Sequence, residues 1–202
     1  MKPAQVKKYL IAQYPEFGKA ISQVEVLSVS CGNKTNVADA VTQIVIGQML
    51  SRHAAQTIYK RVEATRIEKK LEGGWKLSAT ELAAQGVSAR KARSIIEFGK
   101  KYEKNPKHYE NWRKLTYSDL QVEVSSQWGL STWSADILAI SHFGFKDVFP
   151  DNDGTLKRAV AILNDSYYLK SKFQAEKAKP YRTFLSLYLW RLIDDKIITG
   201  VA

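Results

Sequence analysis

The fold of this chain is decided by residues 120–140, LQVEVSSQWGLSTWSADILAI. The stretch predicts a helix to about Gln127, a tight turn around Gly129, and a second helix that begins at Thr132. Two helices joined by a glycine turn form a helical hairpin. The second helix would begin with free backbone N–H groups and the positive end of a helix dipole, which together suit a phosphate group.

The rest of the chain also predicts helices joined by short polar turns. Apolar residues at helical spacing run through residues 37–70, with a break near 48–52. Ser78, with Glu81 three residues later, matches a capping box. The other expected helices lie at about residues 88–104, 118–127, 132–142, 153–163 and 179–194. Residues 24–29 resemble a strand only weakly, so the sequence predicts an all-α fold.

Length and composition limit the class of protein. With 202 residues, of which 45% are hydrophobic, the chain can form one domain or two small lobes with a real core. Its one cysteine, Cys31, allows no internal disulfide and cannot alone hold zinc or an iron–sulfur cluster. No stretch approaches the ~20 apolar residues that span a bilayer, and the N-terminus lacks an apolar signal core. We therefore expect an intracellular protein of the cytoplasm and nucleoid, or of the nucleus in a eukaryote.

The charge of the chain points to a polyanionic partner. The formal net charge is +11, and residues 90–114 hold nine basic residues against three acidic ones. No segment combines a basic face with an apolar insertion face, so a membrane surface is disfavoured. The three histidines show no metal-ligand spacing, and we expect no metal cofactor.

A second motif follows the hairpin, at residues 147–159, DVFPDNDGTLKRA. A hairpin followed by a loop with a proline and by an aspartate at a helix start resembles the helix-hairpin-helix DNA glycosylases. Within that superfamily, the chain is most similar to the 3-methyladenine DNA glycosylase II branch. Three further stretches agree with the resemblance, VIGQMLS at 45–51, GVSARKA at 86–92 and KPYRTFLSLYLW at 179–190. The resemblance covers roughly residues 37–190.

The resemblance implies one glycosylase domain over residues 1–202, without the N-terminal accessory domain of some members. We expect two helical lobes, one from about 37 to 143 and the other from about 1–36 plus 144–202. The DNA-binding cleft would lie between them, with the hairpin and Asp153 facing it. The expected partner is double-stranded DNA that contains damaged bases, bound by a monomer.

Asp153 matches the catalytic aspartate of the family. Breaking an N-glycosidic bond builds positive charge on the sugar, and a carboxylate can stabilise that charge and orient the attacking water. An aspartate at a helix start is also a common N-cap, and the two roles are compatible. Asp151 is the rival carboxylate. Asn152 stands where this branch often has an acidic residue.

Trp133 and Trp190 are the base-pocket aromatics that the resemblance implies. Trp133 stands where some members have a lysine that forms a Schiff base, so the sequence predicts base removal without cleavage of the DNA backbone, leaving an abasic site. Trp190 falls off the apolar stripe of its helix, so it is expected to face a cleft, with a second buried face as the plainer interpretation. A third family aromatic is Ile137 here.

Other positions carry the expected DNA contacts. Met49 stands near the family position of the residue that fills the gap left by a flipped base, with Gln48 and Leu50 as alternatives and helix core as the plainer interpretation. The phosphate site comprises Gly129, Ser131 and Thr132, where Ser131 replaces a second family glycine. Hairpin carbonyls of family members hold a monovalent cation. The basic residues 90, 91 and 93 are expected to be solvated, although residue 91 lies close enough to the turn at Gly86 for a phosphate contact.

Two other functions stay open from the sequence. A module of the same fold that binds nucleic acid without catalysis explains the charge and the hairpin equally well, but has no need of a carboxylate near phosphates. A helical protein–protein scaffold predicts no salt-dependent affinity for DNA. The sequence leaves the preferred lesion undetermined, and an alkylated purine is our expectation.

Overall fold

The computed structural model describes residues 1–29, 35–166 and 172–199, which contain helices and turns but no strand. They separate into two compact units. The terminal unit holds described residues 1–29, 144–166 and 172–199, and the central unit holds described residues 35–143. Cys31 lies outside the described residues. Among those that are described, no helix has both the length and the apolar run that crossing a bilayer requires.

The central unit is built around α3, Val37–Gly47, of which eight residues are buried. Its N-cap is Asn36, whose side chain accepts a hydrogen bond from the backbone N–H of Asp39. α3 packs against α4 (Arg52–Glu68), α6 (Ala89–Lys104) and α9 (Thr132–Ser141). A helix buried on nearly all sides needs apolar residues around its whole circumference, which is the pattern of this segment.

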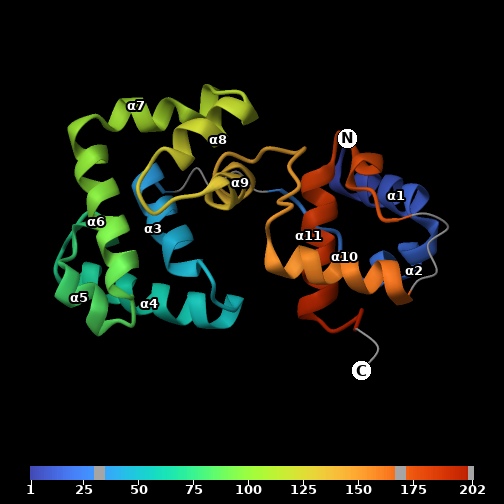
Figure 1. The fold of residues 1–202 in the computed structure, drawn as a ribbon, viewed down its shortest axis with the longest axis horizontal. Helices are drawn as coiled ribbons and strands as arrows, with labels where there is room; N and C mark the ends of the chain where they lie inside the picture. Colours follow the sequence, from blue (N-terminus) through green and yellow to red (C-terminus); the bar gives the residue numbers. More distant parts are fainter. Residues whose placement is uncertain (30–34, 167–171, 200–202) are drawn as a thin grey trace. The chain divides into compact units, whose positions relative to one another are not determined.

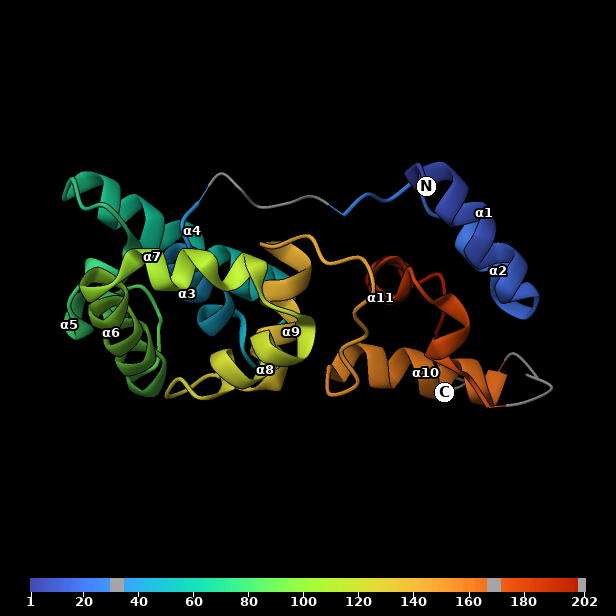
Figure 2. The same cartoon turned by 90° about the horizontal axis from the view of Figure 1, so that it is seen from above.

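The remaining elements of the central unit pack on α3 or on the helices around it. They are η1 (Gly74–Lys76), α5 (Ala79–Ala84), α7 (Pro106–Glu110), η2 (Asn111–Lys114) and α8 (Tyr117–Ser125). α8 and α9 pack against each other as the expected hairpin, visible in both views of the chain (Figures 1 and 2). Both helices bury apolar residues, among them Leu120 and Val124 of α8 and Leu138 of α9.

The terminal unit brings both ends of the chain into one core. Its elements are α1 (Pro3–Gln13), α2 (Pro15–Gln23), α10 (Gly154–Ser166), η3 (Ala175–Ala178) and α11 (Arg182–Asp194). α1 packs against α2, and α10 packs against α11 (Figure 1). Two tyrosines of the N-terminal segment fasten the segment around η3, because the hydroxyl of Tyr9 donates to Lys179 O at 2.7 Å and that of Tyr14 to Gln174 O at 2.8 Å.

The all-α prediction is confirmed, and so are most of the expected helix ends. The break in residues 37–70 falls between α3 and α4, and the Ser78–Glu81 capping box is present. The last helix begins at Arg182, three residues later than expected, with Tyr181 (φ −123°, ψ 31°) as its N-cap. Helices α1 and α2 were not predicted.

Candidate active site and nucleic-acid interface

Asp153 is a buried carboxylate at the start of α10, with 9% of its surface exposed. Its Oδ1 accepts a hydrogen bond from the backbone N–H of Leu156 at 2.9 Å, which is the N-cap contact expected at a helix start. The same oxygen accepts a second hydrogen bond from the indole Nε1 of Trp190, also at 2.9 Å. Two donors from two helices therefore fix the orientation of this carboxylate within the terminal unit.

The rival carboxylate has a different setting. Asp151 lies two residues earlier in the loop and is exposed, at the edge of a cavity of about 290 Å³ lined mainly by apolar side chains such as Phe149 and Phe173. Asn152 is also exposed and accepts a hydrogen bond from the Lys157 ammonium at 3.3 Å. Burial and hydrogen bonding thus distinguish Asp153 from its neighbours.

Trp190 lies on α11 and is partly buried against the core of the terminal unit. The apolar stripe of this helix is buried as predicted, with Phe184, Leu185 and Leu189 in the core. The hydrogen bond from the Trp190 indole to Asp153 was not foreseen from the sequence. It gives Trp190 a definite task beside the predicted contact with a base, which is to hold the carboxylate.

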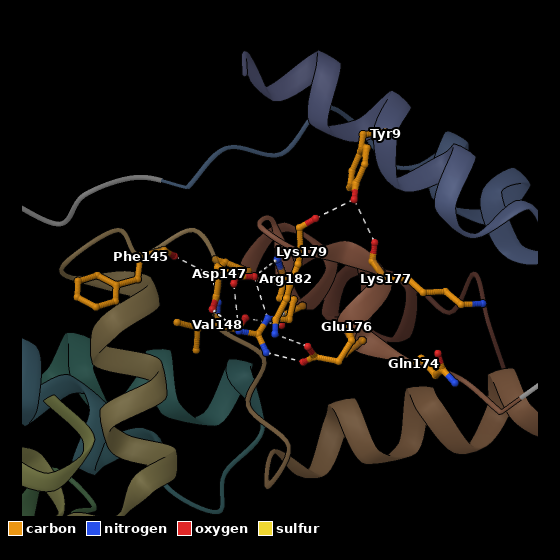
Figure 3. Close-up of polar contacts among 12 residues, drawn as sticks. Tyr9, Phe145, Asp147, Val148, Gln174, Glu176, Lys177, Lys179 and Arg182 are labelled. Atoms are coloured by element: carbon orange, nitrogen blue, oxygen red, sulfur yellow. Dashed lines mark hydrogen bonds and ion pairs between the residues drawn. The ribbon is translucent and has the colours of Figure 1, made fainter. Parts of the chain in front are cut away.

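The loop before Asp153 is anchored to the N-terminus of α11 (Figure 3). The Arg182 guanidinium contacts both carboxylate oxygens of Asp147, at 2.8 and 3.1 Å, and also reaches Glu176 at 2.7 Å. Burial by itself would raise the pKa of Asp147, but the hydrogen bonds and charge of Arg182 outweigh it and keep this pKa below its usual value. Thr183 adds a bond from its hydroxyl to Phe145 O at 2.7 Å and accepts one from the N–H of Val148 at 3.0 Å.

The hairpin turn of the central unit, residues 127–131, depends on Gly129. Its φ is +79°, a region that suits glycine, and a Cβ there would lie 2.5 Å from the hydroxyl of Ser94. The two residues that follow the buried Leu130 are exposed, with Ser131 as N-cap and Thr132 as the first residue of α9. The N–H of Ser131 donates to the Ser134 hydroxyl at 3.3 Å. The rest of the first turn has N–H groups without partners in the helix ladder, as at every helix start.

A second sharp turn, the Met49 turn (residues 47–50), joins α3 to α4. Met49 has a φ of +56° and a fully exposed side chain, while 40% of Leu50 is exposed. Gln48 points the other way, because its amide nitrogen donates to Gly129 O at 3.0 Å and to the Ser134 hydroxyl at 3.2 Å. Of the three residues considered from the sequence, Met49 and Leu50 are both exposed, Met49 the more so, and the helix-core interpretation of Met49 is wrong.

Lys91 differs from its sequence prediction. Its ammonium is partly buried and donates to two backbone carbonyls at the end of α3, Ile46 O at 2.9 Å and Gln48 O at 2.7 Å. The burial lowers the pKa of Lys91. The expected solvated lysine is instead a brace inside the protein, and only its neighbours Arg90 and Arg93 are exposed.

The remaining candidates lie on α9 and α6. Trp133 and Ile137 are partly buried, one turn apart on α9. Arg93 is paired with Glu97 at 2.6 Å and stacks on the exposed Trp128 ring, 4.3 Å from its centroid. Within the described part of the chain, no group of three or more histidine, cysteine, aspartate or glutamate side chains is arranged to hold a metal ion.

Comparison with known proteins finds one partial relative by sequence and several structures of the same fold. An alkylbase DNA glycosidase-like protein of Schizosaccharomyces pombe is 30% identical over 86 residues, which is 39% of this chain and 39% of that protein. The matched stretch is thus well under half of that relative. No protein-family model matches the chain.

Three solved structures share the fold over nearly all of this chain. A 3-methyladenine DNA glycosylase of S. pombe in complex with abasic DNA has a TM-score of 0.74 at 20% identity, covering 94% of this chain and 97% of that one. A DNA-3-methyladenine glycosidase of Bacillus halodurans has a TM-score of 0.67 at 22% identity, covering 93% of this chain and 88% of that one. A 3-methyladenine DNA glycosylase of Archaeoglobus fulgidus has a TM-score of 0.73 at 17% identity, covering 100% of this chain and 72% of that one. The chain therefore has the fold of these 3-methyladenine DNA glycosylases.

Proposed function

We propose that this protein is a monofunctional DNA glycosylase of base excision repair, which hydrolyses the N-glycosidic bond of alkylated purines in double-stranded DNA. The observation that carries the proposal is the setting of Asp153, a buried carboxylate fixed by Leu156 and Trp190 at the head of α10. The relatives with this fold are 3-methyladenine DNA glycosylases, and one of them is bound to abasic DNA.

The chemistry needs one well-placed carboxylate. The bond between C1′ of the sugar and the base nitrogen breaks, and the base leaves with the bonding electrons. Positive charge builds on the sugar, and the negative charge of Asp153 stabilises it in the transition state. A water oxygen then bonds to C1′ and gives up one proton, which a neutral base takes with it or which passes to solvent when the base was already cationic. The products are a free base and an abasic site.

The base would stack on the indole of Trp190, which donates its hydrogen bond to Asp153 within the terminal unit. A cationic alkylated purine stacked on an indole ring gains ~1–2 kcal/mol when water is excluded. Its glycosidic bond is also weakened by the positive charge on the base, so an indole ring and a single carboxylate suit the same substrate. Because position 133 is tryptophan, the chain offers no amine there for a Schiff base, and we propose that strand cleavage is left to other enzymes.

DNA would be gripped by the central unit. The turn with Gly129, Ser131 and Thr132 presents the first N–H groups of α9, which suit a phosphate without regard to sequence. Met49, exposed at the tip of its turn, would fill the space left in the duplex by the flipped nucleotide. Flipping costs a few kcal/mol, which such a wedge helps to offset.

A monovalent cation at the hairpin remains part of the proposal. Backbone carbonyls are hard oxygen donors that suit such an ion. The carbonyl of Trp128 already accepts a hydrogen bond from Ser94 at 3.0 Å, and that of Gly129 accepts one from Gln48 at 3.0 Å. A cation would share these oxygens, which have a second lone pair, or use other carbonyls of the turn. It would neutralise charge where a phosphate binds.

The proposal is tested by incubating the protein with alkylated duplex DNA and separating the released bases by chromatography. We expect release of 3-methyladenine or 7-methylguanine by the natural protein and not by Asp153→Asn. Alkali treatment of the DNA afterwards should cut it at the resulting abasic sites. DNA binding without release of any base would favour the non-catalytic module, and the absence of both would favour the protein–protein scaffold.

A further inference from the structure

The Met49 turn and the hairpin turn are fastened to the same helix. α6 carries Lys91 in its first turn, and Ser94 follows three residues later on the same side. Lys91 donates to the carbonyls of Ile46 and Gln48, at the base of the Met49 turn. Ser94 donates to Trp128 O in the hairpin turn, at 3.0 Å. One helix therefore braces both turns from neighbouring positions.

Gln48 joins the two turns directly. Its carbonyl accepts the Lys91 ammonium at 2.7 Å, while its side-chain amide donates to Gly129 O at 3.0 Å and to the Ser134 hydroxyl at 3.2 Å. That hydroxyl in turn accepts the N–H of Ser131, the N-cap of α9. A continuous chain of hydrogen bonds thus runs from Lys91 through Gln48 to the start of the phosphate-binding helix.

Lys91 is well suited to this task. The last carbonyls of a helix lack partners in its own ladder and carry the negative end of its dipole, so a cation there is favoured. Lys91 satisfies two such carbonyls at the end of α3. These two hydrogen bonds, rather than a contact with phosphate, offset the free-energy cost of partly burying its side chain.

The Met49 turn needs such support. A residue other than glycine with a φ near +56° is in a sparsely populated conformation, which persists only where the surroundings hold it. The exposed Met49 side chain has no packing of its own to fix the turn. A wedge that must enter a base stack gains from a backbone that is already held in place, since less freedom is lost on binding.

We propose that Lys91 is a positioning residue, which acts through Gln48 to hold the Met49 wedge in fixed register with the hairpin phosphate site. The proposal rests on the proposed glycosylase function and deepens it. Lys91 touches neither the base nor the phosphate in this account. It makes the wedge and the phosphate grip one rigid piece of the central unit.

The test compares Lys91→Met with Lys60→Met, a charge-matched control at an exposed position of α4. Base extrusion is followed by the fluorescence of 2-aminopurine placed beside an abasic-site analogue, and excision is followed in single turnover. We expect Lys91→Met to lower both by ~10-fold or more, because small misplacements far from the reacting atoms can cost up to ~10²-fold. Base extrusion and excision by Lys60→Met should stay within about twofold of the natural protein, which is the change expected from the loss of one surface charge.

A double-mutant cycle separates positioning from general damage. If Lys91 acts through the wedge, Lys91→Met should have little further effect once Met49 is alanine. The proposal would be overturned if the excision rate of the double variant fell by the product of the two single-variant effects. It would also be overturned if Lys91→Met excised bases as fast as the Lys60→Met control. Should Lys91→Met fail to fold by circular dichroism, Gln48→Met replaces it, since it removes both amide donors at similar size and should couple to Met49 in the same way.

Hydrogen exchange of the free protein keeps the inference independent of the glycosylase activity. The N–H of Leu50 donates to Gly47 O at 3.2 Å and should exchange faster in Lys91→Met than in the natural protein or Lys60→Met. Unchanged exchange at residues 47–51 would refute the brace even in an active enzyme. If exchange is faster in Lys91→Met but the natural protein releases no base, the bracing role of Lys91 is supported and the proposed function is rejected.

Discussion

Asp153→Asn separates the chemical role of the carboxylate from its structural role. Asparagine keeps an Oδ1 that can accept the N–H of Leu156 and the indole of Trp190, each now at 2.9 Å. It removes the negative charge and replaces the other carboxylate oxygen with an amide NH2 group. Because asparagine caps a helix about as well as aspartate, the free energy of unfolding should change by less than ~1 kcal/mol.

The rate of base release should respond far more strongly. A charge that meets the sugar cation matters in the transition state and hardly in the ground state. We expect a fall of at least ~10² in the single-turnover rate, equivalent to ~2.7 kcal/mol of activation free energy. The affinity for DNA should hold or rise, because a negative charge near phosphates is lost.

Asp153→Ala and Asp151→Asn supply the controls. Alanine removes the cap, at ~1 kcal/mol, and leaves the Trp190 indole without this acceptor, at ~1–3 kcal/mol. Asp153→Ala should therefore lose both stability and activity, whereas Asp153→Asn should lose activity alone. Asp151 is exposed, and its replacement by asparagine should be mild.

The assay pairs single-turnover excision from alkylated DNA with equilibrium unfolding in urea. Excision by Asp153→Asn at the natural rate would show that the charge has no part in the reaction. An inactive Asp151→Asn beside an active Asp153→Asn would mean that the catalytic assignment is two residues too late in the chain. Equal losses of stability in the asparagine and alanine variants would refute the hydrogen-bond account of the site.

Three other outcomes are expected. The logarithm of DNA affinity should fall with the logarithm of salt concentration at about −0.9 per phosphate neutralised, and a flat response in a salt titration would contradict DNA binding. Borohydride should trap no covalent adduct with damaged DNA, because position 133 is tryptophan; a trapped adduct on a gel would place an amine nucleophile in the site. Burial, with Glu63 nearby, raises the pKa of Asp39 from 3.8 to about 6, so its stabilising contribution is present below pH 3.8 and is lost as the pH rises through about 6. The free energy of unfolding of Asp39→Asn should therefore exceed that of the natural protein by ~1 kcal/mol at pH 7.5, after allowance for solvent screening, and should equal it at low pH. Urea unfolding that shows the same gain at both pH values would refute this sign.

Local signals in the sequence predicted the elements that depend on neighbours along the chain. The Ser78–Glu81 capping box and the break after Gly47 are set within a few residues, and both are present. The two N-terminal helices, which the sequence analysis does not predict, have signals of the same kind, Pro3 and Pro15 at first helical positions.

The contacts that orient the candidate site could not be predicted in this way. The indole of Trp190 and the carboxylate of Asp153 are 37 residues apart, and Lys91 lies 43 residues from the carbonyl of Gln48. Nothing in the residues near Lys91 tells whether its ammonium meets a carbonyl, a phosphate or water. Such contacts depend on how distant helices pack, and no pattern of a single segment contains that information.

In both units a basic side chain on a helix holds a candidate-site loop in place. In the terminal unit, Arg182 at the start of α11 binds Asp147 and so fixes the loop that leads to Asp153. In the central unit, Lys91 in the first turn of α6 binds the carbonyls beneath Met49. In each case a cation on a rigid helix is used inside the protein, and the group expected to act on DNA is a nearby residue of a loop. Part of the basic excess of this chain therefore sets the geometry of loops, and a count of positive residues overstates the number that can reach a phosphate.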